Sequence, residues 1–349
     1  MRTLHLRILS AAFAPRSGRL SALSARAASS TGFDVPQVRL NDGTLHPQLG
    51  FGTYKVGFIP ASASAAAAGK EETGATGPTA RECVAEALGL GYRFLDCAEF
   101  YGNEAEVGAS IKDSGIARSE LYLASKVWTT TIFQGEAAVR AQVLKTIQDL
   151  DCDFLDLYCV HWPVPGKHVD AYVALQGLHK EGLIKSLGLS NYAVEDYEEL
   201  MADPRVIVPP SINQIEVNPF LYRRNTLAFF EKNGVVVQSY RALRDGKAFD
   251  DPTVVAIAAK HSKSPAQVLG RWCVQRGCIY IPKSVKKGRM AENAAVFDFE
   301  LDADDLAKLD DLTTEQNLEA FEALYYKCVN RDTPNDGTML GVKAAVTRD

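Results

Sequence analysis

Residues 121–162 read LYLASKVWTTTIFQGEAAVRAQVLKTIQDLDCDFLDLYCVHW, and this stretch holds one complete unit of the architecture that the whole chain repeats. Two short apolar segments, 121–128 and 154–162, stand at its ends and are typical of buried β-strands. Between them, the segment 136–150 has apolar residues that recur at helical spacing: Ala138, Val139, Val143, Ile147 and Leu150. The stretch is therefore predicted to form a strand, a helix and a second strand.

The same alternation continues in both directions. The predicted strands are 49–53, 93–98, 121–128, 154–162, 184–191, 211–217, 235–240 and 278–284. The predicted helices are 80–90, 136–150, 169–181, 194–202, 224–233, 264–276 and 303–312. Eight strands that alternate with helices are typical of a single α/β domain, the (β/α)8 TIM barrel. A doubly wound sheet is the alternative, but no G-x-G-x-x-G opens a helix after a strand, so the usual dinucleotide turn of that fold is missing.

Composition limits the classes of function. The chain has 349 residues, with 38 basic and 43 acidic side chains and a formal charge of −5. This slight acidic excess argues against a protein that binds nucleic acid by neutralising phosphates. No apolar run approaches the ~18 residues of a membrane-spanning helix. Seven cysteines, an odd number without a C-x-x-C motif, argue against a disulfide framework and for a reducing compartment.

Two segments depart from the alternating pattern. Residues 1–33 contain five arginines and no acidic residue or lysine, a composition that predicts an organelle transit peptide, for a mitochondrion ahead of a plastid. The alternative is a tail without an address on a cytoplasmic protein. Residues 56–79 include an Ala/Ser run and show no amphipathic period, which predicts a loop inserted after the first strand. The remainder of 34–349 is predicted to be one barrel domain.

Polar side chains stand where several predicted strands end, the position at which barrel enzymes carry catalytic groups. Asp96 ends the second strand and Tyr101 follows it, while Lys126 lies on the third strand and His161 ends the fourth. An ammonium beside a tyrosine favours phenolate, and a carboxylate keeps a buried lysine charged. A histidine adds a neutral group that can orient a carbonyl. The four residues predict a proton-relay site for reducing a C=O bond, and no H-E-x-x-H or Cys/His cluster suggests a metal.

Residues 91–108 read GYRFLDCAEFYGNEAEVG, and further motifs follow in order. They are Ser125-Lys126, Val160-His161-Trp162-Pro163, Gly188-Leu189-Ser190-Asn191, Asn213-Gln214-Ile215-Glu216 and Ile281-Pro282-Lys283-Ser284. This series resembles the aldo-keto reductase family, whose pattern begins G-Y-R-x-[IL]-D-x-A-x-x-Y-x-N-E-x-x-[IVL]-G. The resemblance runs from about Val38 to Leu312. It implies a barrel with an N-terminal β-hairpin and a C-terminal loop.

The resemblance also implies roles for individual residues. Tyr101 is expected to be the general acid, with Lys126 and Asp96 as its tuners and His161 as the group that orients the carbonyl. The residues expected to contact the nicotinamide end of the cofactor are Gly52, Thr53, Ser190, Asn191, Gln214 and Tyr240. Those expected to bind the adenosine and its 2′-phosphate are Lys283, Ser284, Arg289, Glu292 and Asn293.

The span 283–293 favours NADP over NAD on physical grounds as well. It contains four basic residues just before a helix, an arrangement that suits a dianionic phosphate. The alternative is a solvated basic turn. NADP(H) is therefore the expected cofactor.

The sequence as a whole predicts NADPH-dependent reduction of an aldehyde or ketone, with a hydride from the nicotinamide and a proton from Tyr101. His161 and the aromatic side chains of Trp128 and Trp162 are expected to contact this small carbonyl or alcohol substrate. No nucleic acid and no membrane span are expected. One alternative is a non-catalytic nucleotide-binding subunit, because the family includes channel-associated members. Another is a different barrel oxidoreductase that works mainly in the alcohol-oxidising direction.

Overall fold

The computed structural model describes residues 32–57 and 77–331, with side chains to residue 323. Most of the predicted leader 1–33 and most of the predicted insertion 56–79 lie outside the described residues. The two ends of the predicted insertion that the structure describes, Val56 and Thr79, contact the barrel domain. Val56 is buried, and its carbonyl accepts a hydrogen bond from Asn103 Nδ2 at 2.9 Å. Thr79 is the N-cap of the next helix.

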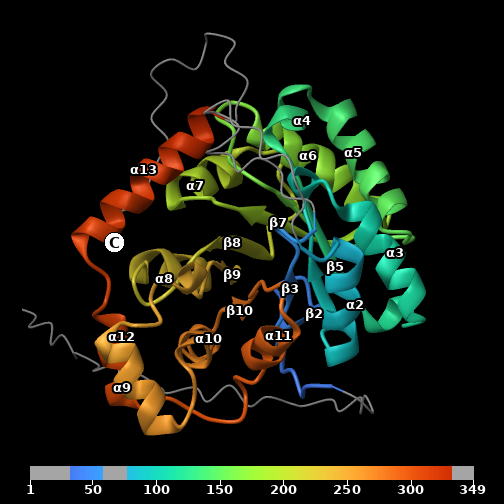
Figure 1. Cartoon of the computed structure of the whole chain (residues 1–349). Coiled ribbons are helices and arrows are strands. Elements are labelled where there is room, and N and C mark those ends of the chain that lie inside the picture. The colour runs from blue at the N-terminus through green and yellow to red at the C-terminus, as the bar shows by residue number, and fades with distance from the viewer. Residues whose placement is uncertain (1–31, 58–76, 332–349) are drawn as a thin grey trace, which may run out of the picture.

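Eight parallel strands form one sheet in the order in which the chain visits them. They are β3 (Phe51–Gly52), β4 (Phe94–Asp96), β5 (Tyr122–Val127), β6 (Leu155–Val160), β7 (Ile184–Ser190), β8 (Ile212–Glu216), β9 (Val236–Tyr240) and β10 (Ile279–Tyr280). The sheet closes on itself, because Gly50 N donates to Tyr280 O and Tyr280 N donates to Gln48 O, each at 2.9 Å. Helices surround these strands in Figure 1. The predicted (β/α)8 barrel is confirmed, and each predicted strand contains one of the eight.

The predicted helices are all present, and each observed helix end lies within two residues of the predicted end. They are α2 (Ala80–Leu90), α5 (Glu136–Asp149), α6 (His168–Lys180), α7 (Val194–Ala202), α8 (Arg224–Lys232), α10 (Pro265–Gln275) and α12 (Ala303–Asp310). Local side chains set several starts: Thr79 and Ser264 each form a capping box with the third residue of the helix. Within the described ranges, no helix is long and apolar enough to cross a membrane.

The structure adds helices that were not predicted. They are α3 (Glu104–Ser114), α4 (Thr129–Phe133), α9 (Pro252–His261), α11 (Lys287–Ala294) and α13 (Glu315–Arg331). A readable signal existed for α9, since Asp251 caps it and Pro252 occupies its first turn. The C-terminal segment expected as a loop is corrected over 315–331, where α13 forms because this 17-residue run contains neither glycine nor proline.

The expected N-terminal hairpin is present and seals one end of the barrel. Strands β1 (Gln37–Arg39) and β2 (Leu45–Pro47) pair antiparallel. His46 of this hairpin packs on the rings of Phe94 and Tyr122, with centroids 4.6 and 4.0 Å apart. These two residues begin β4 and β5, so the hairpin covers the amino ends of the strands. The carboxyl ends, where the predicted site residues stand, are left for function.

Candidate active site

Three of the predicted catalytic side chains meet at the carboxyl ends of β4 and β5. Asp96 is the last residue of β4, and Tyr101 ends the short 3-10 helix η1 (Glu99–Tyr101) that follows it. Lys126 Nζ lies 2.8 Å from Asp96 Oδ1 and 3.3 Å from Tyr101 Oη. The same ammonium donates to Cys97 O at 2.8 Å. The structure therefore brings an acid, a cation and a phenol into one hydrogen-bonded cluster.

Burial and charge set the protonation of this cluster. Burial alone lowers the pKa of Lys126, but the charge of Asp96 and its hydrogen bond to the ammonium act in the opposite direction, so the pKa is raised and the ammonium persists. Burial raises the pKa of Tyr101, and the Lys126 ammonium pulls it down against the charge of Asp96. The net direction differs from the expected lowering, because loss of water around the phenol outweighs the ammonium. Tyr101 is therefore a protonated donor at neutral pH.

His161 follows β6 and lies beside this cluster. Its ring is 6.0 Å from the Tyr101 ring and nearly perpendicular to it, at 82°. Burial, aided by the Lys126 ammonium, lowers the pKa of His161 well below 6.5, so the imidazole is neutral. Its Nδ1 is buried without a hydrogen-bond partner among the described residues. A neutral imidazole is suited to form a hydrogen bond with a polar ligand atom.

The polar residues expected at the nicotinamide form a connected line across β7, β8 and β9. Ser190 Oγ donates to Gln214 O at 3.1 Å, and Asn191 Nδ2 donates to Ser190 Oγ at 3.1 Å. Tyr240 Oη donates to Asn191 Oδ1 at 2.7 Å. Asn191 also has a left-handed backbone, with φ at 61°. The line is ordered by its own hydrogen bonds at the carboxyl ends of these strands.

Gln214 is bound in a way that its expected role did not include. Its amide nitrogen donates to Asp96 Oδ1 and to Gln238 Oε1, both at 2.8 Å. An NH2 group has two hydrogens, so both are used and the amide oxygen is what Gln214 can offer to a carboxamide. Gln238 was not predicted at the site. A signal existed, because Gln238 lies two residues before Tyr240 and therefore on the same face of β9.

Basic residues gather at the start of α11. Lys287 Nζ pairs with Glu86 Oε2 at 2.5 Å. No ion pair within the described residues involves Lys283, Lys286 or Arg289. Lys283 is exposed, and partial loss of water together with the charge of Lys55 lowers its pKa. Cations beside a helix N-terminus are the kind of group that attracts an anion.

The other residues expected to contact the cofactor lie near this cluster or near β3. Gly52 and Thr53 are buried at the end of β3. Ser284 Oγ accepts a hydrogen bond from the backbone N–H of Lys286, the residue directly before α11, at 3.1 Å. Glu292 and Asn293 lie on the second turn of that helix, and Asn293 is buried.

Aromatic rings line one side of the catalytic cluster. Trp128 stacks on Phe100 with centroids 4.0 Å apart, and it stands edge-on to His161 at 4.8 Å. The ring of Tyr54 lies 5.1 Å from the ring of Tyr101. Trp162, directly after His161, is half-buried. Phe100 and Tyr54 were not predicted, although Phe100 directly precedes the tyrosine of the motif.

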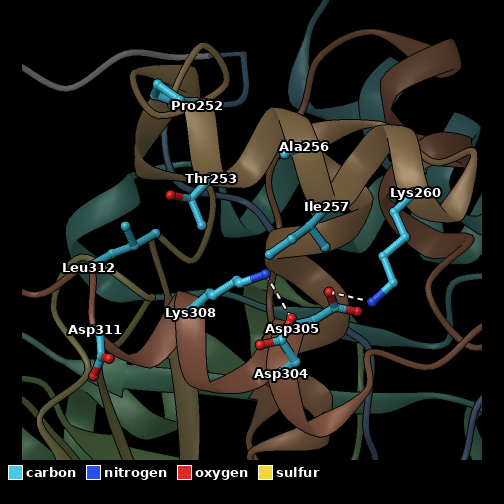
Figure 2. Close-up of a pocket in the computed structure, with 10 residues that line it drawn as sticks. All are labelled: Pro252, Thr253, Ala256, Ile257, Lys260, Asp304, Asp305, Lys308, Asp311 and Leu312. Carbon is cyan, nitrogen blue, oxygen red and sulfur yellow. Dashed lines mark hydrogen bonds and ion pairs between the residues drawn. The ribbon is translucent and has the colours of Figure 1, made fainter.

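A pocket on the outside of the barrel is separate from this site (Figure 2). It lies between α9 and α12 and shares no residue with the catalytic cluster. Asp304 and Asp305 at this pocket pair with Lys308 and Lys260, at 2.7 and 2.8 Å. These two carboxylates are therefore neutralised by neighbouring lysines.

Curated relatives of the chain include reductases of bacteria. The glyoxal reductase of Bacillus subtilis (strain 168) is 37% identical over 281 residues, which cover 80% of this chain and 94% of that protein. The methylglyoxal reductase DkgA of Salmonella typhimurium (strain LT2) is 37% identical over 280 residues, which cover 78% of this chain and 93% of that protein.

These relatives overturn the mitochondrial location that residues 1–33 led us to expect. They come from bacteria, which contain no mitochondria, and the match takes in nearly their whole length. The expectation rested on composition alone, in a segment that lies almost entirely outside the described residues. The prediction of a mitochondrial protein is therefore wrong.

The similarity extends to the fold and to the family. The solved structure of a Gox0644 variant in complex with NADPH matches with a TM-score of 0.70 at 35% identity, covering 81% of this chain and 95% of that one. The model described as "Aldo/keto reductase family" matches residues 64–314, more than half of the chain. The non-catalytic alternative has no counterpart in either curated relative. The chain therefore belongs to the aldo/keto reductase family and is an oxidoreductase.

Proposed function

We propose that the protein reduces an aldehyde or ketone to the alcohol with NADPH, and that Tyr101 is the proton donor. The observation that carries this proposal is the position of Lys126 Nζ, 2.8 Å from Asp96 Oδ1 and 3.3 Å from Tyr101 Oη. An ammonium at this distance stabilises the phenolate that remains after proton donation. It therefore makes the buried phenol a stronger acid than burial alone would allow.

The residues act in a definite order. NADPH, when held by the residues proposed below, would supply the hydride for the carbonyl carbon. As negative charge builds on the substrate oxygen, Tyr101 donates its phenolic proton to that oxygen, which completes the C–OH group. Lys126 stabilises the resulting phenolate, and Asp96 keeps Lys126 charged and aimed. The neutral His161 holds the substrate oxygen by a hydrogen bond, and Tyr101 regains a proton from water after the alcohol leaves.

The cofactor would be held by residues at the strand ends and by residues at the start of α11. The residues proposed to hold it are Gly52, Thr53, Ser190, Asn191, Gln214, Tyr240, Lys283, Ser284, Arg289, Glu292 and Asn293. Lys283 and Arg289, which form no ion pair within the part of the chain that the structure describes, fit the extra phosphate of NADPH, because a dianion gains from both the charges and the helix dipole. The NADPH complex of the structural relative Gox0644 supports the same choice.

The proposed substrate class is small aldehydes, with 2-oxoaldehydes first. The two curated relatives are named for glyoxal and methylglyoxal, which are compounds of this class. The rings of Tyr54, Phe100 and Trp128 stand beside the catalytic cluster and offer an apolar face to a planar carbonyl compound. Trp162 is proposed to complete this wall beside His161.

The test is NADPH consumption by purified protein with glyoxal, methylglyoxal and aromatic aldehydes. Tyr101→Phe is expected to lower kcat roughly 10²- to 10⁴-fold, because the proton donor is lost. NADPH affinity, measured by fluorescence titration, is expected to change little. Tyr158→Phe is the matched control, since Tyr158 is a fully buried tyrosine of the core under the helices, outside the catalytic cluster. Full turnover in Tyr101→Phe contradicts the mechanism, and a wild-type protein without turnover contradicts the function.

A further inference from the structure

A line of buried polar side chains runs through the barrel from the N-terminal hairpin to the catalytic carboxylate. Gln238 Nε2 on β9 lies 2.8 Å from His46 Nε2 on β2. Gln214 Nε2 on β8 lies 2.8 Å from Gln238 Oε1 and also 2.8 Å from Asp96 Oδ1. None of these four residues is more than 4% exposed. The line therefore connects the closed floor of the barrel to the open, catalytic end without contact with bulk water.

The direction of these hydrogen bonds is set at the hairpin. His46 Nδ1 lies 2.8 Å from Pro47 O, and a carbonyl oxygen only accepts, so Nδ1 carries the proton. Burial lowers the pKa of His46 to about 3 against the opposing effect of the Pro47 bond, so the ring is neutral and Nε2 is an acceptor. Gln238 must therefore turn its NH2 group toward His46 and its oxygen toward Gln214.

The same direction is required at the catalytic end. The Asp96 carboxylate only accepts, so Gln214 must present its NH2 group to it. The second hydrogen of that NH2 group meets the oxygen of Gln238. Turning either amide over would set two donors or two acceptors against each other, where no water can compensate. The two ends of the line therefore agree on a single arrangement.

We propose that His46, Gln238 and Gln214, which we call the barrel relay, are positioning residues that fix the Asp96 carboxylate for carbonyl reduction. This inference rests on the proposed function of Tyr101 as the acid. The relay begins at His46 in the N-terminal hairpin. A residue at the closed end of the barrel therefore helps to position the carboxylate at the catalytic end.

The effect of the relay on the acid follows from the donors of Asp96. Its Oδ1 accepts from Lys126 Nζ and from Gln214 Nε2, each at 2.8 Å. The second donor spreads the negative charge of the carboxylate, so less of it acts on Tyr101. Because that charge raises the pKa of Tyr101, the relay makes Tyr101 a stronger acid.

The kinetic test compares Gln238→Leu and His46→Leu with the wild type. Each is expected to lower kcat about tenfold and to change the KM for the carbonyl less than about twofold, because the acid weakens while the substrate site stays. The basic limb of the kcat profile is expected to move to higher pH, since Tyr101 holds its proton more tightly. His46→Gln, whose amide oxygen replaces the acceptor Nε2, is expected to restore most of kcat.

Ser239→Ala is the matched control. It removes an equally buried hydrogen bond, from Ser239 Oγ to Val217 O at 2.7 Å, at the residue next to Gln238 but outside the relay. Its pH profile is expected to match that of the wild type. Leucine variants that lose stability but keep the wild-type pH profile would overturn the proposal, because the relay would then serve packing only.

A second measurement does not depend on turnover. Nitrogen NMR of His46 is expected to show a protonated Nδ1 and an accepting Nε2. Gln214→Leu, two steps along the relay, is expected to shift the Nε2 resonance because Gln238 loses the donor that orients it, whereas Ser239→Ala leaves it in place. An unchanged resonance in Gln214→Leu overturns the relay. If the wild type reduces no carbonyl, the proposed function fails and this spectrum alone decides the relay.

Discussion

Lys126 shows how completely a single buried charge is satisfied at the active site. Its ammonium has three hydrogens, and they meet Asp96 Oδ1, Cys97 O and Tyr101 Oη. Replacing Lys126 or Asp96 alone leaves the other charge buried and uncompensated, which typically costs about 3–5 kcal/mol. Loss of activity in such variants therefore mixes chemistry with folding. Tyr101→Phe separates them, because it removes only a hydroxyl.

A second single-residue change, at Arg289, tests the proposed preference for NADPH over NADH. Arg289→Ala is expected to weaken NADPH about tenfold or more and NADH less than about twofold, because only NADPH carries the 2′-phosphate. Equilibrium titration with both cofactors measures the two effects. Lys287→Ala is the matched control, since Lys287 is already paired with Glu86. An equal loss for both cofactors would remove Arg289 from the phosphate site.

Among the elements, the contact between α3 and the end of α5 depends on Gly108. A Cβ at this position would lie 2.1 Å from Asp149 O, so a side chain forces the two helices apart. Gly108→Ala is expected to cost about 1–3 kcal/mol. Gly89→Ala in α2 meets nothing within 4 Å and is expected to gain about 0.5–1 kcal/mol, because alanine favours the helix. Urea denaturation of both variants measures the contrast, and two equal shifts would contradict it.

The start of α12 gives the protein an acid-sensitive element. Asp302 caps this helix by accepting from two backbone N–H groups, and it pairs with Lys260 at 2.6 Å. The hydrogen bond that Lys260 donates to Asp302 lowers the pKa of Asp302 from 3.8 to about 2. Lys260 also donates to the neighbouring Asp305, as Figure 2 shows. A lowered pKa stabilises the fold above about pH 4, and the contribution is lost as the pH falls toward 2.

The variant Asp302→Asn separates the effect of the Asp302 charge from the effect of its helix capping. Asparagine keeps a capping oxygen but not the ion pair, so the variant is expected to lose less stability on acidification than the wild type does. Urea titrations across the acid range measure the slope of stability against pH. The same slope in both proteins would mean that the charge of Asp302 contributes nothing to acid sensitivity.

At the scale of the whole molecule, barrel closure removes the free edges of the sheet. The seam between β3 and β10 is held by Gly50 N donating to Tyr280 O at 2.9 Å and Gly52 N donating to Pro282 O at 3.0 Å. These amides are expected to exchange hydrogen as slowly as the central strands, because no strand opens alone. The amide of Gln48, which bonds to Pro36 O beside the hairpin, is expected to exchange faster. Seam amides that exchange faster than Gln48 would indicate an open sheet.

Local patterns account for what could be predicted of the fold and the site. Each strand is an apolar run between turn residues, and Asp96, Tyr101 and Lys126 stand within motifs of recognisable spacing. Helix α4 was missed because it is only five residues long. His46 and Gln238 were missed for another reason: they are 192 positions apart in the chain, and nothing near either residue indicates the other.

The sequence by itself determined the barrel and the kinds of group at its strand ends, because hydrophobic period and motif spacing are local properties of the chain. Only the tertiary structure decided how those groups behave. It decided that burial affects the pKa of Tyr101 more than the Lys126 ammonium does. It also decided that the NH2 group of Gln214 donates to Asp96 and Gln238. Loss of water and hydrogen-bond direction depend on everything that surrounds a group in space, and residues distant in the chain supply most of those surroundings.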